Sequence, residues 1–370
     1  MIQAIVSVIV VLSILIFFHE LGHFLVARRL GVKVLKFSLG FGPKIIGKQI
    51  GETEYLLSLF PLGGYVKLLG EDPADMTTPE DEARSFSKQS VGRRIAIVAA
   101  GPIFNFVLAF LIFMVVFIIG YPNLSSQIGE VQKGTPAERA GLNTGDVVVA
   151  IEGKPVMLWD DLKEAVQNYG GKEIHLAVVD CKNYQDVSRC REERAETQQI
   201  LKLTPEEKDG KSLLGDNIKE WRIGISPKGS FIMKHYDPIT ATLLGAKRTL
   251  EVTGLTFMGL VRLIEGRIPA STIGGPILIA QLAGQQAAVG LINISFFIAI
   301  LSINLGVINF LPIPILDGGH LLFFVIEAIM GQPVSLKKRE MAQQVGLFLL
   351  LALMFFAFYN DIMRIFKPGS

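Results

Sequence analysis

Charged residues are scarce in this sequence of 370 residues, since Asp, Glu, Lys and Arg together make up only 19% of it. An ordinary soluble domain carries closer to about 25%. Half of the residues are hydrophobic and the mean hydropathy is +0.44. A disordered chain is excluded too, because such chains are polar and rich in charge. The composition therefore predicts a membrane protein with at least one water-exposed portion.

The sequence also lacks an excess of either charge and is poor in cysteine. Its 36 Lys and Arg residues against 34 Asp and Glu give a net charge of +2. A nucleic-acid-binding protein would show a basic excess, so we expect no nucleic-acid partner. Two cysteines are too few for a disulfide scaffold.

Four apolar segments are long enough to cross a bilayer, which takes about 20 residues. They cover residues 2–30, 95–119, 291–310 and 345–366. A cleaved signal peptide is the alternative for the first segment, but it lacks the basic start and the small-residue cleavage site of such peptides. A weaker stretch at 273–289 is rich in Gly and Gln and favours a re-entrant or interfacial element.

Basic residues next to these segments predict the orientation of the chain. They are Arg28, Arg29, Lys33 and Lys36 after the first segment, Arg93 and Arg94 before the second, and Lys337, Lys338 and Arg339 between the third and the fourth. The positive-inside rule places both of these loops in the cytoplasm. Residues 121–285 and both termini then lie outside.

The external segment has the pattern of a soluble domain followed by a membrane-surface helix. Strands are predicted at 128–131, 146–151, 174–179 and 221–225, a helix at 159–169, and a polar loop at 204–215. Residues 231–268 show an amphipathic helical pattern with basic residues among apolar ones, typical of a helix at the membrane surface. An ordinary helix packed on the soluble domain is the alternative.

The first apolar segment contains His19-Glu20-Leu21-Gly22-His23, an H-E-x-x-H pattern. Residues four apart share one face of a helix, so both imidazoles can bind one zinc ion, with Glu20 in reach of a water molecule there. Ionisable side chains are costly in hydrocarbon and are usually functional there. A polar cluster that only packs helices is the alternative. Arg28 lies eight residues beyond Glu20. At a helical rise of about 1.5 Å per residue, the pattern then lies about 12 Å below the cytoplasmic edge of the membrane.

Two histidines leave a catalytic zinc ion one protein ligand short. His175 and His235 lie in the external segment, so Asp317 and His320 remain. Both follow prolines that force an extended chain, and irregular backbone at membrane depth is tolerated only against protein or water. Alternatively, Asp317 is a helix cap before Gly318.

Taken together, these motifs resemble the site-2 protease family of intramembrane zinc metalloproteases. The resemblance rests on His19–His23, on Asn309, Pro312, Pro314, Asp317 and Gly318, and on the bacterial-type segments Gly40–Pro43, Phe60–Lys67 and Gly101–Asn105. Residues 129–156 resemble a PDZ domain, through Thr135–Ala137, Ala140–Leu142 and Gly145-Asp146. The match covers nearly the whole chain, although bacterial members of this type commonly carry two PDZ domains and we find one.

The resemblance implies a role for particular residues. His19, His23 and Asp317 would bind Zn²⁺, with Glu20 as general base and His320 in local polar packing. The expected substrate-binding residues are Asn309, Pro312, Pro314, Gly63, Gly64 and Tyr65. The last three belong to segment 53–69, which has strand character and a predicted Gly63-Gly64 turn; the family match makes it a re-entrant β-loop that pairs with the substrate. A plain surface hairpin is the alternative.

In the PDZ-like domain, we expect a peptide groove between a strand and a helix. Its walls would be Ile223, Gly224 and Ile225 on the strand and Leu162 and Val166 on the helix, although such apolar residues are often plain core.

The two cysteines flank a polar loop on the oxidising side of a bacterial inner membrane. We therefore expect a disulfide between Cys181 and Cys190. Two free thiols are the alternative.

The predicted fold is a polytopic α-helical membrane protein, with four transmembrane helices, a re-entrant β-loop and an inserted extracytoplasmic PDZ-like α+β domain. Its parts are the first span with the zinc motif (1–30), the cytoplasmic-side β-loop region (31–94), the second span (95–120), the periplasmic PDZ domain (121–228), amphipathic or interfacial helices (229–290) and the last two spans (291–370). We expect His19, Glu20, His23 and Asp317 to be the few ionisable residues left in the apolar half of the chain.

The predicted function is zinc-dependent cleavage of single-span membrane proteins near the cytoplasmic face of the bacterial inner membrane. By resemblance, the substrates are an anti-sigma factor already shortened outside the membrane and remnant signal peptides. The lipid bilayer is the other expected partner, and the sequence is silent on oligomeric state. Two alternative functions remain. The first is a non-catalytic adaptor that captures peptides with its PDZ-like domain, but this alternative does not explain an ionisable Glu20 at that depth. A metal transporter would need further intramembrane ligands along a path.

Overall fold

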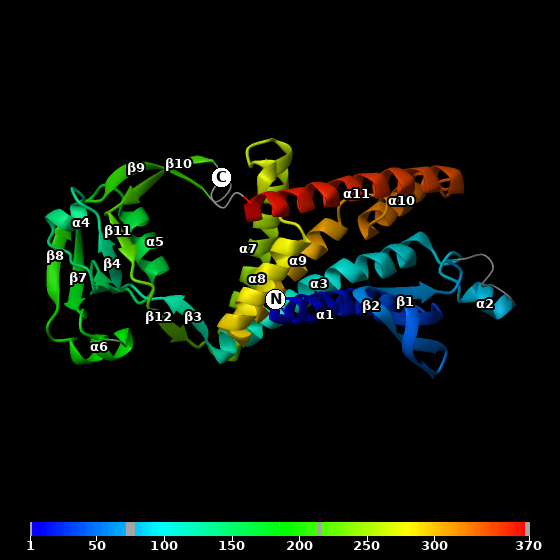
Figure 1. The fold of residues 1–370 in the computed structure, drawn as a ribbon, viewed down its shortest axis with the longest axis horizontal. Helices are drawn as coiled ribbons and strands as arrows, with labels where there is room; N and C mark the ends of the chain where they lie inside the picture. Colours follow the sequence, from blue (N-terminus) through cyan, green and yellow to red (C-terminus); the bar gives the residue numbers. More distant parts are fainter. Residues whose placement is uncertain (1, 72–77, 185, 213–215, 367–370) are drawn as a thin grey trace. The chain divides into compact units, whose positions relative to one another are not determined.

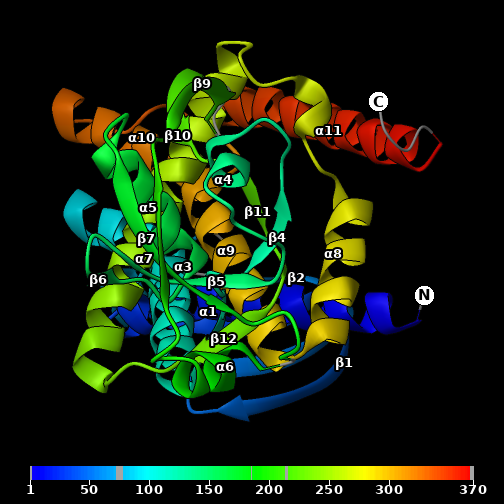
Figure 2. The same cartoon turned by 90° about the vertical axis from the view of Figure 1, so that its left-hand side faces the viewer.

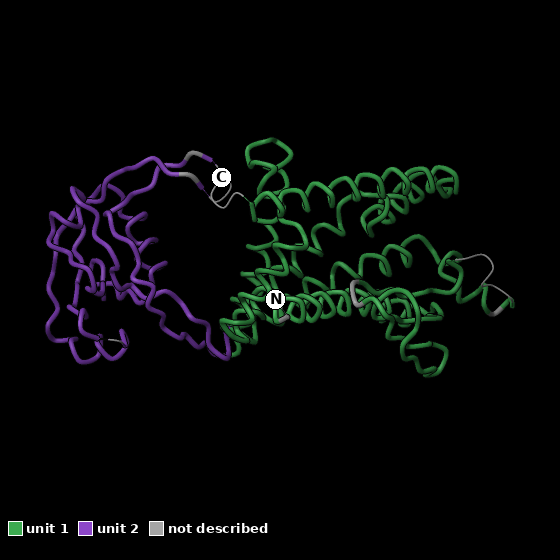
Figure 3. Tube along the Cα trace, viewed as in Figure 1, with its two compact units in different colours: residues 1–116, 238–370 green, residues 117–237 purple. Residues whose placement is uncertain are grey.

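The computed structural model describes residues 2–71, 78–184, 186–212 and 216–366. It divides into two compact units, distinguished by colour in Figure 3. The first unit combines Met1–Val116 with Pro238–Ser370, and the second is Phe117–Asp237. The second unit is therefore an insertion in the chain of the first.

Four helices of the first unit are long and apolar enough to cross a membrane, as predicted. They are α1 (Ile2–Arg29), α3 (Val91–Ile119), α9 (Leu291–Asn309) and α11 (Leu336–Phe366), shown in Figure 1. Two of them, α3 and α11, begin before the apolar segments predicted from residues 95 and 345. Their first turns take in basic residues, because a helix can extend beyond the apolar run that a membrane requires.

Five further helices among the described residues complete this unit. They are α2 (Pro79–Ala83), α7 (Pro238–Ile264), the 3₁₀ helix η2 (Ala270–Thr272), α8 (Pro276–Val289) and α10 (Asp317–Met330). With 14 residues, α8 is too short to span a bilayer. It packs closely on α1, since a Cβ atom on Gly284 would lie 2.8 Å from the Cβ atom of Ala4.

Two long strands, β1 (Val34–Ile50) and β2 (Thr53–Leu68), pair antiparallel and pack on α1 (Figure 1). Strand β1 was not predicted from the sequence. The tight turn between the two strands is at Gly51-Glu52. Strand β2 also reverses direction between Leu57 and Gly64, close to the predicted Gly63-Gly64 turn, since both residues pair with Leu39 from opposite sides.

Both strands bend, and β1 pairs on both of its sides. Phe37 pairs with Val66 on one side and with Tyr55 on the other. The first half of β1 therefore lies between the two halves of β2. Residues 64–66 lie on the outer side of β1, and no other strand among the described residues pairs with them there. The N–H group of Leu68, further along, donates to the carboxylate of Glu71.

The second unit is built from short strands around a main apolar core. A four-stranded antiparallel sheet has the order β6 (Lys154–Pro155), β5 (Asp146–Ile151), β7 (Ile174–Asp180), β8 (Gln199–Leu203). A second pair joins β4 (Ile128–Val131) to β11 (Ile225–Pro227), which lie side by side in Figure 2. Helices α4 (Pro136–Arg139), α5 (Trp159–Tyr169) and α6 (Val187–Glu193) complete it. The predicted strands at 128–131 and 146–151 and the helix at 159–169 are confirmed.

Three local predictions for this part of the chain are wrong. Much of the predicted loop at 204–215 is β9 (Glu206–Lys211), which pairs with β10 (Asn217–Arg222); residues 213–215 lie outside the described residues. The predicted strand at 221–225 is broken at Gly224, which has a φ of +84°. The predicted helix from residue 231 begins only at Pro238.

Residues 231–234 instead form β12 (Phe231–Lys234), which pairs with β3 (Tyr121–Leu124). Exposure alternates along β12, from 64% at Phe231 to 8% at Ile232 and 48% at Met233. A period of two is typical of a strand. A longer helical pattern follows directly after these residues, which is why a helix was predicted for them. The compact unit consequently extends to Asp237.

The predicted set of ionisable residues in the apolar half of the chain was also incomplete. Glu327 on α10 is buried and forms an ion pair with Arg94 of α3. Asp361 on α11 is 2% exposed and accepts hydrogen bonds from the backbone N–H groups of Gly275, Ile277 and Leu278. It thereby caps the N-terminus of α8, where a carboxylate is favourable.

Cys181 and Cys190 are joined by a disulfide bond in the structure, with their Cα atoms 5.9 Å apart. The bond ties α6 to the end of β7. Both cysteines are fully buried in a small second core of this unit, together with Val147, Val187 and Ile232.

Candidate metal centre

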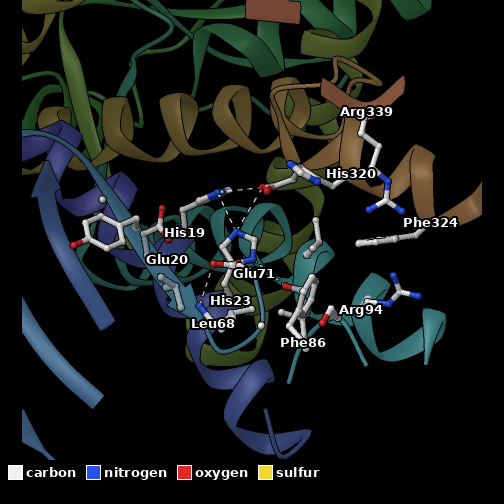
Figure 4. Close-up of a pocket in the computed structure, with 18 residues that line it drawn as sticks. His19, Glu20, His23, Leu68, Glu71, Phe86, Arg94, His320, Phe324 and Arg339 are labelled. Carbon is white, nitrogen blue, oxygen red and sulfur yellow. Dashed lines mark hydrogen bonds and ion pairs between the residues drawn. The ribbon is translucent and has the colours of Figure 1, made fainter. Parts of the chain in front are cut away.

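The H-E-x-x-H pattern lies in the second half of α1, where its two histidines share one face. The Nε2 atoms of His19 and His23 are 3.3 Å apart, and their ring planes are nearly perpendicular. Figure 4 shows the two side chains pointing toward each other. Helical spacing alone accounts for this meeting, because residues i and i+4 are neighbours on the helix surface.

Asp317 reaches the histidines from the other end of the sequence, at the first position of α10. Its Oδ2 atom lies 3.1 Å from Nε2 of His19 and 3.6 Å from Nε2 of His23. The loop before α10 folds tightly onto the two glycines that follow Asp317. A Cβ atom on Gly318 or Gly319 would lie only 2.1 or 2.3 Å from backbone carbonyl oxygens of that loop. These glycines thus let the loop close and hold Asp317 beside α1.

These three side chains fit a zinc ion. Their ligand atoms all lie within 4.8 Å of one another, and the pairwise distances are 3.1, 3.3 and 3.6 Å. Tetrahedral zinc with bonds of about 2.0–2.1 Å separates its ligand atoms by about 3.3–3.4 Å. The buried Oδ2 atom of Asp317 accepts no hydrogen bond of acceptable geometry from the described residues. A cation between the three atoms removes that deficit, and three protein ligands are what a catalytic zinc site provides.

Helix α3 places a polar group beside the Nδ1 atom of each imidazole. The carbonyl oxygen of Ile97 lies 2.9 Å from Nδ1 of His23, and the side-chain amide of Asn105 lies 3.1 Å from Nδ1 of His19. Gly101 lies between them in sequence, and all three fall on one face of α3 because they are four residues apart. In the sequence, Gly101 and Asn105 stood out only as part of a family motif. An asparagine inside an apolar span was the available signal.

The imidazoles of His19 and His23 occupy the space that a side chain at position 101 would need. A Cβ atom there would lie 2.2 Å from Nε2 of His23 and 2.9 Å from Cε1 of His19. We expect Gly101→Ala to displace both rings and reduce bound zinc from stoichiometric to little or none, measured by elemental analysis of the purified protein. Gly92→Ala on the same helix is the control, because its Cβ atom would meet open space. Full zinc content in Gly101→Ala would contradict this account.

A cavity of about 520 Å³ opens beside the three ligands. His19, Glu20, His23 and Asp317 line one part of it, together with Gly64 and Tyr65 of β2. Other residues of its lining, labelled in Figure 4, are Glu71, Phe86, Arg94, His320, Phe324 and Arg339. The three candidate ligands, Glu20 and residues of β2 therefore line one cavity.

Four other predicted site residues are not among the described residues that line this cavity. Asn309 is the last residue of α9 and is 8% exposed. Pro312 and Pro314 belong to the loop that closes on α10, where Pro314 lies against Gly319. Gly63 packs against the ring of Phe41.

The five residues predicted for the PDZ groove come together in the second unit. Ile223, Gly224, Ile225, Leu162 and Val166 all line a cavity of about 330 Å³ there. Three of the side chains, at positions 162, 166 and 223, are at most 5% exposed and belong to the apolar core of the unit. They form the floor of the cavity and the core at the same time, so the two alternatives for these residues are compatible.

Comparisons with known proteins agree with this site. Residues 7–353 match the family model described as Peptidase family M50. The chain is 37% identical to an Agrobacterium fabrum protein named "Putative zinc metalloprotease", covering 97% of this chain and 95% of that protein. It is 31% identical to the Escherichia coli protein named regulator of sigma-E protease, covering 97% and 98%. The second alignment runs over 457 positions, so that relative has internal segments that this chain lacks.

Proposed function

Because the chain belongs to peptidase family M50 and is an intramembrane zinc metalloprotease, we propose that it cleaves single-span membrane proteins with His19, His23 and Asp317 as zinc ligands and Glu20 as general base. The observation that carries the proposal is the spacing of the three ligand atoms, 3.1–3.6 Å apart, beside Glu20 within an apolar helix. If these residues only packed helices together, Oδ2 of Asp317 should accept a hydrogen bond, because buried polar atoms usually do. Among the described residues, this buried atom has no hydrogen-bond partner.

Each residue then has a defined task. A zinc ion at this site supplies a Lewis acid that acidifies water and polarises a peptide carbonyl group. Glu20 takes the proton from the attacking water and delivers it to the leaving amine. Asn309 is proposed to bind the substrate backbone, supported by its position at the end of α9 before the loop that carries Asp317. The apolar surroundings exclude competing water from that hydrogen bond.

A protease must act on an extended chain, and a transmembrane helix hides its peptide bonds. We propose that residues 64–66 of β2 bind the unwound substrate by strand addition. Their outer edge has no strand partner among the described residues. Gly64 and Tyr65 line the same cavity as Glu20, and a Cβ atom on Gly64 would lie 3.1 Å from Cγ of Glu20. A strand paired there would pass directly over the ligands.

Strand addition makes a prediction with a period of two. The purified protein is reconstituted in vesicles with a single-span model peptide, and each amide near the cut is N-methylated in turn. We expect cleavage to be lost at alternate positions, because only every second N–H group points toward the edge strand. Equal effects at consecutive positions would contradict strand addition, and failure to cut any single-span peptide would contradict the proposed substrate class.

We further propose that the protein lies in the bacterial inner membrane with its second unit in the periplasm. The basic residues at the end of α1 and the start of α11 support a cytoplasmic location for the nearby site. The Cys181–Cys190 disulfide in the second unit supports an oxidising compartment. An anti-sigma factor and remnant signal peptides are the proposed substrates, by resemblance and by the name of the Escherichia coli relative.

The second unit is proposed to act as a single PDZ-like domain. Its cavity lies between α5 and the segment that leads into β11, the arrangement in which such domains bind an extended peptide. The extra length of the Escherichia coli relative is consistent with a second domain there that this chain does not have.

A further inference from the structure

We infer that Asn105 is a positioning residue for the metal site: its side-chain amide oxygen holds His19 with the ring proton on Nδ1, which leaves Nε2 free to bind zinc. The inference deepens the proposed function and rests on its assignment of His19 as a ligand. It concerns a residue in the middle of α3, far in sequence from all three ligands.

The first observation is the contact itself. The amide of Asn105 lies 3.1 Å from Nδ1 of His19, and Asn105 is completely buried. The main chain at the same residue is held too, since its carbonyl oxygen accepts a hydrogen bond of 2.7 Å from Oγ of Ser302 on α9. The amide therefore projects toward His19 from a fixed point between two helices.

The second observation is an unsatisfied atom. With the amide nitrogen toward His19, Oδ1 of Asn105 is buried and has no hydrogen-bond partner among the described residues. A buried amide oxygen left in this way is unfavourable. Nitrogen and oxygen of an amide have nearly the same shape, so a half-turn of the group changes only which atom faces the imidazole.

The requirement for zinc binding determines which atom of the Asn105 amide faces His19. A neutral imidazole has one N–H group, and Nε2 can bind a metal only if the proton is on Nδ1. Nδ1 is then a donor and needs an acceptor opposite it. The amide oxygen of Asn105, turned toward His19, is that acceptor, and the turn also gives the buried oxygen its missing partner. Outer hydrogen bonds of this kind fix the tautomer and ring orientation of metal-binding histidines.

The same device serves the other histidine. His23 Nδ1 faces the carbonyl oxygen of Ile97 at 2.9 Å, which can only accept, so this ring is already held with Nε2 free. One backbone acceptor and one side-chain acceptor, eight residues apart on one face of α3, thus orient the two imidazoles. Only the side-chain acceptor can be removed by mutation.

The test compares two substitutions at position 105 by zinc affinity, measured by competition with a chelator in detergent. Asn105→Asp keeps an acceptor and is expected to bind zinc at least as tightly as the unmodified protein. Asn105→Leu keeps the approximate size without the acceptor, and we expect about 10- to 100-fold weaker binding. Asn304→Leu is the control, because Asn304 makes a similar side-chain hydrogen bond, to Thr256, away from the metal site.

A tautomer readout separates positioning from packing. In the zinc-free state, ¹⁵N NMR of His19 should show the Nδ1–H form in the unmodified protein and in Asn105→Asp, and a mixture of tautomers in Asn105→Leu. Unchanged zinc affinity in Asn105→Leu would overturn the inference. Equal weakening by the two substitutions would do so too, since that is the result of a packing role. If His19→Ala retains full zinc affinity, the ligand assignment itself is wrong, and that outcome is distinct from both.

Discussion

Glu20→Gln is expected to abolish cleavage while zinc stays bound. Glutamine keeps the size of the side chain but cannot accept a proton, and general base catalysis contributes about 10²- to 10⁴-fold to such reactions. Zinc is expected to be retained because the proposed ligands are His19, His23 and Asp317, which the change leaves in place. The measurement is cleavage of a single-span model substrate in vesicles, together with zinc content of the same sample.

Two control variants make this result specific. Glu251→Gln removes a carboxylate on α7 whose ion pairs, among the described residues, are with the surface residues Lys247 and Arg248, so full activity is expected. His19→Ala should lose zinc and activity together. Equal cleavage by Glu20→Gln and the unmodified protein would remove Glu20 from the mechanism, and loss of zinc from Glu20→Gln would make it a part of the metal site instead.

Breaking the Arg94–Glu327 ion pair is expected to destabilise the protein by about 3–5 kcal/mol. Arg94 of α3 donates two hydrogen bonds, of 3.1 and 2.6 Å, to the carboxylate of Glu327 on α10. Both side chains are only 10% exposed. The ring of Phe324 covers the guanidinium group, with 4.9 Å between ring centroid and Cζ. Glu327→Leu leaves the buried Arg94 charge without this carboxylate, which accounts for the large penalty.

The measurement is a double-mutant cycle on thermal or denaturant unfolding in detergent. Glu327 also lies 3.6 Å from Nη2 of Arg339, so it keeps one partner in Arg94→Met. Arg94→Met with Glu327→Leu removes both charges of the closer pair, and we expect this double variant to be less destabilised than Glu327→Leu alone. The exposed pair of Arg84 and Glu52 is the matched control. It has the same two-hydrogen-bond geometry at 2.6 Å, with side chains 42% and 51% exposed. Its loss should leave the free energy of unfolding nearly unchanged, because solvent screens exposed charges. Similar losses for both pairs would contradict a role for burial.

The structure agrees with those predictions that depend only on residues close together in the sequence. A run of about 20 apolar residues must cross a bilayer as a helix, since only a helix satisfies its own backbone there. Four such helices appear close to their predicted positions. The meeting of His19 with His23 is equally local, because helix geometry alone brings residues four apart together.

The errors concern elements whose partner is distant or whose pattern is hidden by a stronger one. Residues 231–234 form a strand because β3, more than a hundred residues earlier, offers an edge to pair with. The turn at Gly51-Glu52 was not predicted because it joins β1 to β2, and β1 itself was not predicted. Strand formation depends on such a partner far more than on the segment's own residues. Glu327 and Asp361 were overlooked because their partners also come from other helices.

The sequence by itself determined that this chain is a membrane protein with a two-histidine motif and a glutamate in its first span. Motif resemblance then selected Asp317 over His320. Only the tertiary structure decided that Oδ2 of Asp317 meets both histidines, that Gly101 leaves room for their rings, and that Asn105 faces His19. The physical reason is distance along the chain. Residues on one helix turn meet wherever that helix forms, whereas residues on α1, α3 and α10 meet only when the helices pack.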